Sequence, residues 1–208
     1  MPQQPFKLVA QAVTRLYGPG EEAGVGEYEP GDFILTHGNS WTSRLIRWGQ
    51  RLRFWGADRK YAWWNHAAMI VSSDGDLIEA LGAGVLATNI SRYKRTQYHL
   101  VHLGAIAIPG DREQVVRFTK QCVGQKYGYL TIVSIALSLL TGGKFNFGFD
   151  GQFICSGLVA RALERTSAIF NRSPSHIMPA DLAKYFGVEP PGPSSAIGEI
   201  PPVPKEAA

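Results

Sequence analysis

The pattern of apolar and polar positions predicts a chain that combines short strands with helices. Four apolar segments have the length and the flanking turn residues of strands: 33–36, 66–71, 77–81 and 98–108, the last long enough for one or two strands. Asp74-Gly75 separates the second segment from the third, and the pair predicts a β-hairpin. A further turn is predicted around Gly84.

Apolar residues at helical spacing predict five helices: 7–16, 40–55, 111–123, 155–163 and 180–186. The third begins with a possible capping box, Asp111 with Gln114, and ends at Gly124. Residues 19–29 and 142–151 are rich in Gly and predict loops. A Pro-rich tail that we expect to be flexible begins at residue 189.

The second predicted helix is basic and aromatic. Its apolar positions recur at near-helical spacing and comprise Trp41, Leu45, Trp48, Leu52 and Trp55. Arginines are interleaved with them at positions 44, 47, 51 and 53. We expect the aromatic stripe to pack on the core and the arginines to be solvated, and we keep peripheral membrane docking as the alternative.

Length and composition are those of one globular domain. The 208 residues are 45% hydrophobic and 18% charged, which excludes disorder for most of the chain and leaves no room for a second full domain. We expect an N-terminal extension at 1–27, a catalytic domain at 28–188 and a tail at 189–208. The net charge of +4 is modest and its basic residues are mostly dispersed, so we expect no nucleic-acid partner.

The start of the chain has no basic stretch followed by an apolar core, so no secretory signal is predicted. The longest apolar run, residues 129–140, is shorter than the roughly 20 residues that a membrane-spanning helix needs. Two cysteines, Cys122 and Cys155, are too few for a disulfide framework. These features predict a cytoplasmic location.

Cys155 is the candidate nucleophile because it opens an apolar helix. Backbone N–H groups and the positive end of the helix dipole favour the thiolate at such a position. The alternative is that Cys155 is a small buried apolar residue. Cys122 lies on the apolar face of a predicted helix and is explained by packing.

A cysteine nucleophile needs a base and a group that orients the base. Among the five histidines, His66 heads an apolar strand, and Glu79 lies on the strand predicted to pair with it. With Asp74-Gly75 as a two-residue turn, Glu79 pairs with Ile70, on the same face as His66. That register leaves the two side chains roughly 13 Å apart along the strand, so contact needs a bulge or a shifted pairing.

Five segments in this order resemble the permuted papain-like amidases, and more specifically the YiiX-like branch of the NlpC superfamily. They are residues 30–35, 65–71, 77–80 with 84–85, 124–129 and 153–159. The resemblance implies an α+β, circularly permuted papain-like fold, with a small antiparallel barrel-like sheet packed against helices. It also implies that the Pro30-Gly31-Asp32 turn is structural and starts the first barrel strand.

The same resemblance implies that Cys155 is the nucleophile, His66 the general base and Glu79 the orienting residue. Tyr127 matches a tyrosine that helps line the family's site. Asn65 and Ser156-Gly157 depart from the residues common at these positions, and the Gly/Phe-rich loop before Cys155 is long. These departures bear on the substrate more than on the triad.

We therefore expect a cysteine amidase or peptidase that acts through a thioester, without a metal or cofactor. Its substrate would be a peptide, an amino-acid amide or a lipid-like molecule. One alternative is a lipid acyltransferase of the lecithin:retinol acyltransferase-like type, which uses the same intermediate. Another is a catalytically silent binding module in which Cys155 is only packed.

Overall fold

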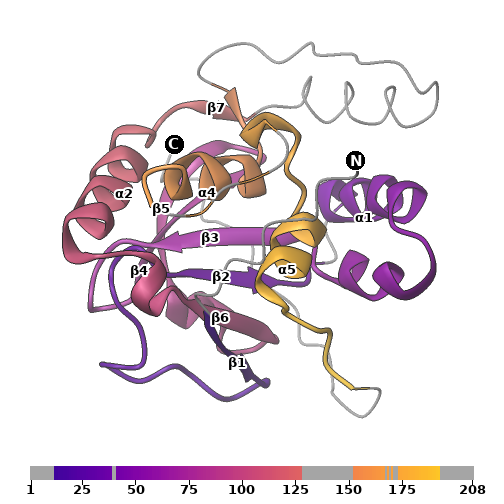
Figure 1. Cartoon of the computed structure of the whole chain (residues 1–208), viewed down its shortest axis with the longest axis horizontal. Coiled ribbons are helices and arrows are strands. Elements are labelled where there is room, and N and C mark those ends of the chain that lie inside the picture. Colours follow the sequence, from indigo (N-terminus) through magenta and orange to yellow (C-terminus); the bar gives the residue numbers. More distant parts are fainter. Residues whose placement is uncertain are drawn as a thin grey trace, which may run out of the picture.

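The computed structural model describes residues 12–38, 41–127, 152–166, 168, 170 and 173–192. These residues form an α+β structure around a six-stranded antiparallel sheet with the strand order β1-β6-β2-β3-β4-β5 (Figure 1). Its strands are β1 (Val13–Tyr17), β2 (Phe33–Thr36), β3 (His66–Ile70), β4 (Asp76–Leu81), β5 (Gly84–Asn89) and β6 (Tyr98–His102). A small parallel pair joins β7 (Lys126–Tyr127) to β8 (Gln152–Phe153).

The helices are α1 (Trp41–Arg53), α2 (Pro109–Gln121), α4 (Cys155–Leu163) and α5 (Pro179–Phe186). Short 3₁₀ helices are η1 (Gly56–Trp63), η2 (Ile90–Tyr93), η3 (Gly104–Ile106) and η4 (Pro174–His176). The predictions of α1, α4 and α5 are confirmed. A helix is also confirmed at α2, but it begins at Pro109 with Ile108 as its N-cap, so the predicted capping box of Asp111 and Gln114 is wrong. The predicted apolar run 129–140, the loop 142–151, residues 1–11 and the tail from 193 lie outside the described residues.

Alternate residues of the central strands enter two cores, as the strand period requires. Phe33 and Met69 join a core on the side of α4, which packs against β3 (Figure 1). Ile34 and Ile70 join a second core on the opposite face. The central strands are therefore covered on both sides, which explains why residues 33–35 and 67–70 are all apolar.

The prediction of a helix over residues 7–16 is wrong where the structure describes it. Residues 13–17 form β1, which pairs with β6 from Val13↔His102 to Tyr17↔Tyr98. The sequence Val-Thr-Arg-Leu-Tyr is β-branched and alternating, and the free edge of β6 offers it ladder hydrogen bonds. Part of the expected N-terminal extension thus belongs to the sheet.

The segment predicted as a turn around Gly84 is a strand. Gly82-Ala83 forms a two-residue turn, and β5 then pairs with β4 along its whole length, from Leu81↔Gly84 to Asp76↔Asn89. Gly84 starts the strand with φ +129, and a Cβ there would lie 2.8 Å from the Gln125 carbonyl oxygen. Gly84 therefore serves this close approach of two backbone segments, which is why a glycine stands in the strand.

The face of α1 that meets the protein is only partly the one predicted, because Leu45 packs against the core but Trp48 does not. Gly49 and Gln50 are buried, whereas Trp48 and Trp55 are 47% and 73% exposed. Gln50 donates to the Trp64 carbonyl at 2.8 Å and accepts from the Ala180 N–H at 2.8 Å. Polar anchoring therefore replaces the expected packing of the aromatic stripe.

The Pro30-Gly31-Asp32 turn is structural, as predicted. Asp32 is fully buried directly before β2 and binds His102 Nδ1 at 2.6 Å and Arg112 Nη1 at 2.8 Å. It also accepts from the N–H groups of Glu29 and Leu103. These contacts fix the entry to β2 and attach α2 to the sheet.

No helix within the described ranges is both long enough and apolar enough to cross a membrane.

Candidate active site

Cys155 is the first residue of α4 and is 1% exposed. The His66 side chain and the backbone N–H groups of Ala67 and Ser156 interact with its sulfur and lower the pKa of the thiol. Ser156 lies in the first turn of α4, where N–H groups have no helical partner. Both the helix start and the sheet thus surround the sulfur with donors.

The sulfur occupies a place where β3 and β4 separate. The Ile70 N–H donates to the Asp32 carbonyl on the β2 side at 2.8 Å. N–H groups alternate in direction along an antiparallel strand, so the Ala67 N–H points to the β4 side. In the described sheet, however, β3 pairs with β4 only at Met69↔Ile78 and Ile70↔Leu77. Cys155 therefore takes the position that a carbonyl of β4 would otherwise fill.

His66 and Glu79 are in direct contact, with Nε2 2.6 Å from Oε2. The predicted register is wrong: Ile70 pairs with Leu77 rather than Glu79, and Val71 bonds Asp76 across a four-residue loop. Extending this register sets Glu79 level with Ala68, roughly 7 Å along the strand from His66 instead of 13 Å. Two side chains can bridge that distance. Since Glu79 binds Nε2, Nδ1 is left for Cys155.

Glu79 is fully buried and has four side-chain partners. Besides His66, Oε2 accepts from Tyr93 Oη at 2.5 Å, while Oε1 accepts from Thr88 Oγ1 at 2.6 Å and Arg92 Nη1 at 3.2 Å. The His66 and Tyr93 rings also stack, with centroids 6.4 Å apart. The carboxylate is thereby fixed in charge and in position.

Sequence reasoning missed Thr88, Arg92 and Tyr93. They come from the end of β5 and from η2. Three donor side chains within residues 88–93 were the available signal.

The pKa values follow from this packing. Burial opposes charge on His66, but Cys155 and Glu79 outweigh it and raise the His66 pKa from 6.5 to about 10. Burial also opposes the Cys155 thiolate, yet His66 and the two N–H groups lower its pKa below the ordinary 9.0. For Glu79, its hydrogen bonds overcome burial and lower the pKa to about 2. Both shifts favour the thiolate–imidazolium form of the Cys155–His66 pair.

The other histidines have different surroundings. His37 stacks on Trp63 and binds its carbonyl, and His102 binds Asp32. The pKa of His99 is lowered to about 4 by burial. His176 lies in η4, with Nδ1 3.3 Å from Ser175 Oγ.

The residues that depart from the family pattern have structural roles. Asn65 is buried and bonds both the N–H and the carbonyl of Gly38, at 2.7 and 2.9 Å. Ser156 Oγ donates to the Ile177 carbonyl at 2.7 Å. A Cβ on Gly157 would lie 3.2 Å from the Pro174 carbonyl oxygen. These positions hold α4 and the end of β2 in place.

The backbone of Tyr127 lies beside the segment that leads into α4. It pairs with Phe153, two residues before Cys155. Its side chain is outside the described part of the structure, so its predicted role in substrate binding stays a prediction.

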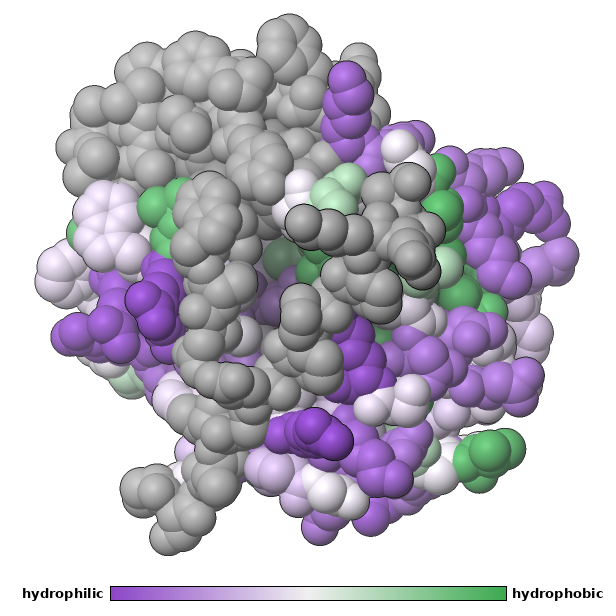
Figure 2. Space-filling model, turned by 180° about the vertical axis from the view of Figure 1, so that it is seen from behind, coloured by the Kyte–Doolittle hydropathy of each residue, from purple (hydrophilic) through white to green (hydrophobic). Residues whose placement is uncertain are grey.

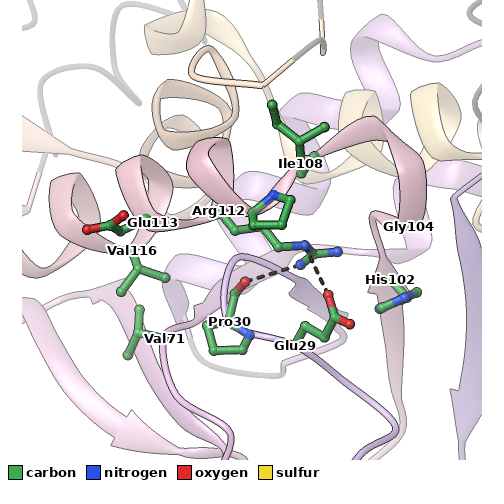
Figure 3. Close-up of a pocket in the computed structure, with 11 residues that line it drawn as sticks. Glu29, Pro30, Val71, His102, Gly104, Ile108, Arg112, Glu113 and Val116 are labelled. Atoms are coloured by element: carbon green, nitrogen blue, oxygen red, sulfur yellow. Dashed lines mark hydrogen bonds and ion pairs between the residues drawn. The ribbon is translucent and has the colours of Figure 1, made fainter.

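A cavity of about 810 Å³ lies at the other end of β3 (Figure 3). Its wall is mainly apolar and includes Val71, Ile108 and Val116, while Arg112 crosses it to pair with Glu29. Val71 is five residues from His66, roughly 16 Å along an extended chain. This cavity is separate from the cysteine cluster and was not predicted from sequence.

No protein-family profile and no curated protein matches the chain. Over the described ranges, no group of three or more His, Cys, Asp or Glu side chains is arranged to hold a metal ion. The structure thus defines an α+β protein with a buried cluster of Cys155, His66 and Glu79. An ion pair of thiolate and imidazolium can supply both a nucleophile and a proton donor.

Proposed function

We propose that the protein is a cysteine amidase or peptidase that hydrolyses an amide bond through a thioester on Cys155. The single observation that supports this most is the grouping of Cys155 with His66, whose Nε2 lies 2.6 Å from the fully buried carboxylate of Glu79. The order of the chain, with the histidine strand before the cysteine helix, supports a circularly permuted papain-like fold. A buried cysteine that served packing alone would not need two charged partners aligned behind it.

In the proposed reaction, the Cys155 thiolate attacks the amide carbonyl and forms a C–S bond. The N–H groups of Ala67 and Ser156, which solvate the thiolate, are then available to stabilise the negative oxygen. His66 gives its proton to the leaving nitrogen as the C–N bond breaks. The neutral imidazole then takes a proton from water, which attacks the thioester and releases the acid.

Trapping the acyl-enzyme tests the proposal. The full chain is incubated with a pool of peptides, amino-acid amides and lipids, and adducts are located by mass spectrometry of proteolytic fragments. We expect a peptide- or amide-derived acyl group on Cys155 in the native protein and none in His66→Ala. Cys122→Ala is the matched control, because Cys122 is buried outside the cluster and its loss should leave the adduct intact.

An acyl group derived only from lipids would replace the amidase proposal with lipid acyl transfer. No adduct with any substrate, together with Cys155 alkylation no faster than that of an ordinary thiol, would favour a silent binding module.

A further inference from the structure

Helix α1 is an amphipathic helix whose aromatic and basic side faces outward. Arg44, Trp48 and Arg51 are four and three residues apart, so they share one side of the helix, and all three are exposed. Trp55 follows the end of the helix, is 73% exposed and donates its indole N–H to the Leu52 carbonyl. These four residues define the Trp/Arg surface.

The opposite side of α1 attaches to the body through polar contacts. Gln50 bonds Trp64 and Ala180, and Arg53 forms an ion pair with Asp181. Large aromatic side chains are uncommon on the solvent-exposed face of a helix whose other face packs against the protein. The orientation is therefore specified by Gln50 and Arg53, and it leaves the two tryptophans uncovered by the described residues.

Charge is concentrated in the same region. Residues 41–63 contain six basic residues and one acidic residue, a formal charge of +5, against +4 for the whole chain, so the remainder sums to −1. Helix α1 itself has no acidic residue. Figure 2, in which α1 lies on the left because the view is turned by 180°, shows strongly hydrophilic side chains beside nearly neutral ones there.

We propose that the Trp/Arg surface binds the face of an anionic phospholipid bilayer. Arginines at this position are attracted to negatively charged headgroups. Indole rings prefer the interface between headgroups and acyl chains, which suits Trp48 and Trp55 better than a purely electrostatic partner does. Nucleic acid or an acidic protein would use the arginines but gives the two exposed indoles no such environment.

When the Trp/Arg surface binds a membrane, the membrane would lie near the end of the sheet that carries His66. The segment from β2 to α1 is tied to this end, because Gly38 exchanges two hydrogen bonds with Asn65, the residue before His66. Arg47 of α1 also approaches His37 Nε2, at 3.0 Å. The inference does not depend on the catalytic proposal, since binding can occur whether or not Cys155 reacts.

Vesicle co-sedimentation of the full chain tests the inference. The vesicles are phosphatidylcholine alone or a mixture of phosphatidylcholine and phosphatidylserine, at low and at high salt. We expect binding to the mixed vesicles only, weakened by salt. Arg44→Gln with Arg51→Gln should lower the partition coefficient roughly 25-fold, at about 1 kcal/mol, or fivefold, for each arginine near the surface.

Two further variants distinguish the possible partners. Trp48→Ala with Trp55→Ala should lower vesicle binding although the net charge is unchanged. Lys120→Gln with Arg161→Gln removes as much charge as the double arginine variant, but from exposed positions elsewhere, and should have little effect. Equal loss in the two charge variants would overturn the inference. So would full binding by the tryptophan variant, or binding to an oligonucleotide or polyglutamate as tight as to the mixed vesicles. Catalytic loss in His66→Ala should leave vesicle binding intact, so the two proposals fail independently.

Discussion

Replacing Glu79 by Gln tests the electrostatic arrangement of the cysteine cluster. The rise of the His66 pKa from 6.5 to about 10 corresponds to roughly 5 kcal/mol in favour of the imidazolium, at about 1.4 kcal/mol for each pKa unit. Glu79 and Cys155 supply this preference together. Gln removes the charge and turns an N–H₂ group toward side chains that are themselves donors. We therefore expect the free energy of unfolding to fall by about 3–5 kcal/mol and the Cys155 pKa to rise.

The pH dependence of this loss has a defined sign. The Glu79 pKa is lowered from 4.5 to about 2, so its contribution to stability is present above pH 4.5 and is lost as the pH falls through about 2. The His66 pKa is raised from 6.5 to about 10, so its contribution is present below pH 6.5 and is lost as the pH rises through about 10. The difference in unfolding free energy between native protein and Glu79→Gln should be largest between these windows, from pH 4.5 to 6.5.

The assay follows alkylation of Cys155 by iodoacetamide as a function of pH, with mass spectrometry of the modified peptide. In the native protein the rate should stay high well below the ordinary thiol pKa of 9.0, and in Glu79→Gln its midpoint should move upward. Cys122 is an internal reference, because burial raises its pKa. Thr88→Val is the matched control, since it removes one hydrogen bond to Glu79 and keeps the charge. An identical midpoint in native protein and Glu79→Gln would refute the reasoning.

Three further substitutions test other parts of the fold, each by urea unfolding. Tyr93→Phe removes the 2.5 Å hydrogen bond to the Glu79 carboxylate and should reduce stability by about 1.5–3 kcal/mol; an unchanged midpoint would show that the hydroxyl is dispensable. Asp32→Ala leaves the buried guanidinium of Arg112 without its 2.8 Å partner and should cost about 3–5 kcal/mol, whereas a loss below about 1 kcal/mol would mean that solvent replaces the carboxylate. Gly75→Ala adds a Cβ 2.6 Å from a neighbouring side chain at φ +80 and should cost about 1–3 kcal/mol; native stability would show that the loop shifts freely.

The hairpin of β3 and β4 shows which features of the site are readable in the sequence. Apolar runs on both sides of Asp74-Gly75 identify the two strands, because strand propensity and turn chemistry are local. The register is different: a two-residue and a four-residue loop both accommodate Asp-Gly, and they differ by two residues in pairing. The observed pairing of Ile70 with Leu77 depends on contacts made by β2 and β5. A local sequence pattern carries no information about contacts with other strands. The contact between Glu79 and His66 could therefore be seen only in the structure.

Helix α1 illustrates a second limit. Its hydrophobic periodicity correctly predicts a helix, and the stripe of Trp and Leu correctly identifies one side of it. Leu45 of this side packs on the core as predicted, but the prediction is wrong for Trp48 and Trp55. The reason is that Gln50 finds three buried backbone partners across η1 and α5. Hydrogen bonds to groups distant in the chain can outweigh the burial of a tryptophan, since unsatisfied buried groups cost about 1–3 kcal/mol each. Periodicity finds the stripe but not the surface it faces.

The separation of β3 from β4 connects the fold to the proposed chemistry. If β3 and β4 had continued to pair beyond Met69, a β4 carbonyl would have accepted a hydrogen bond from the Ala67 N–H. The two strands would then also be paired beside His66. Because the strands separate, that N–H has no acceptor on β4, and a buried N–H without an acceptor is unfavourable. The start of α4 compensates by bringing both a sulfur that accepts the hydrogen bond and its own unpaired N–H groups. A thiolate accepts such bonds more strongly than a thiol does. The same opening that interrupts the sheet therefore favours the charged form of Cys155, so the sheet's geometry and the residue's reactivity have one physical origin.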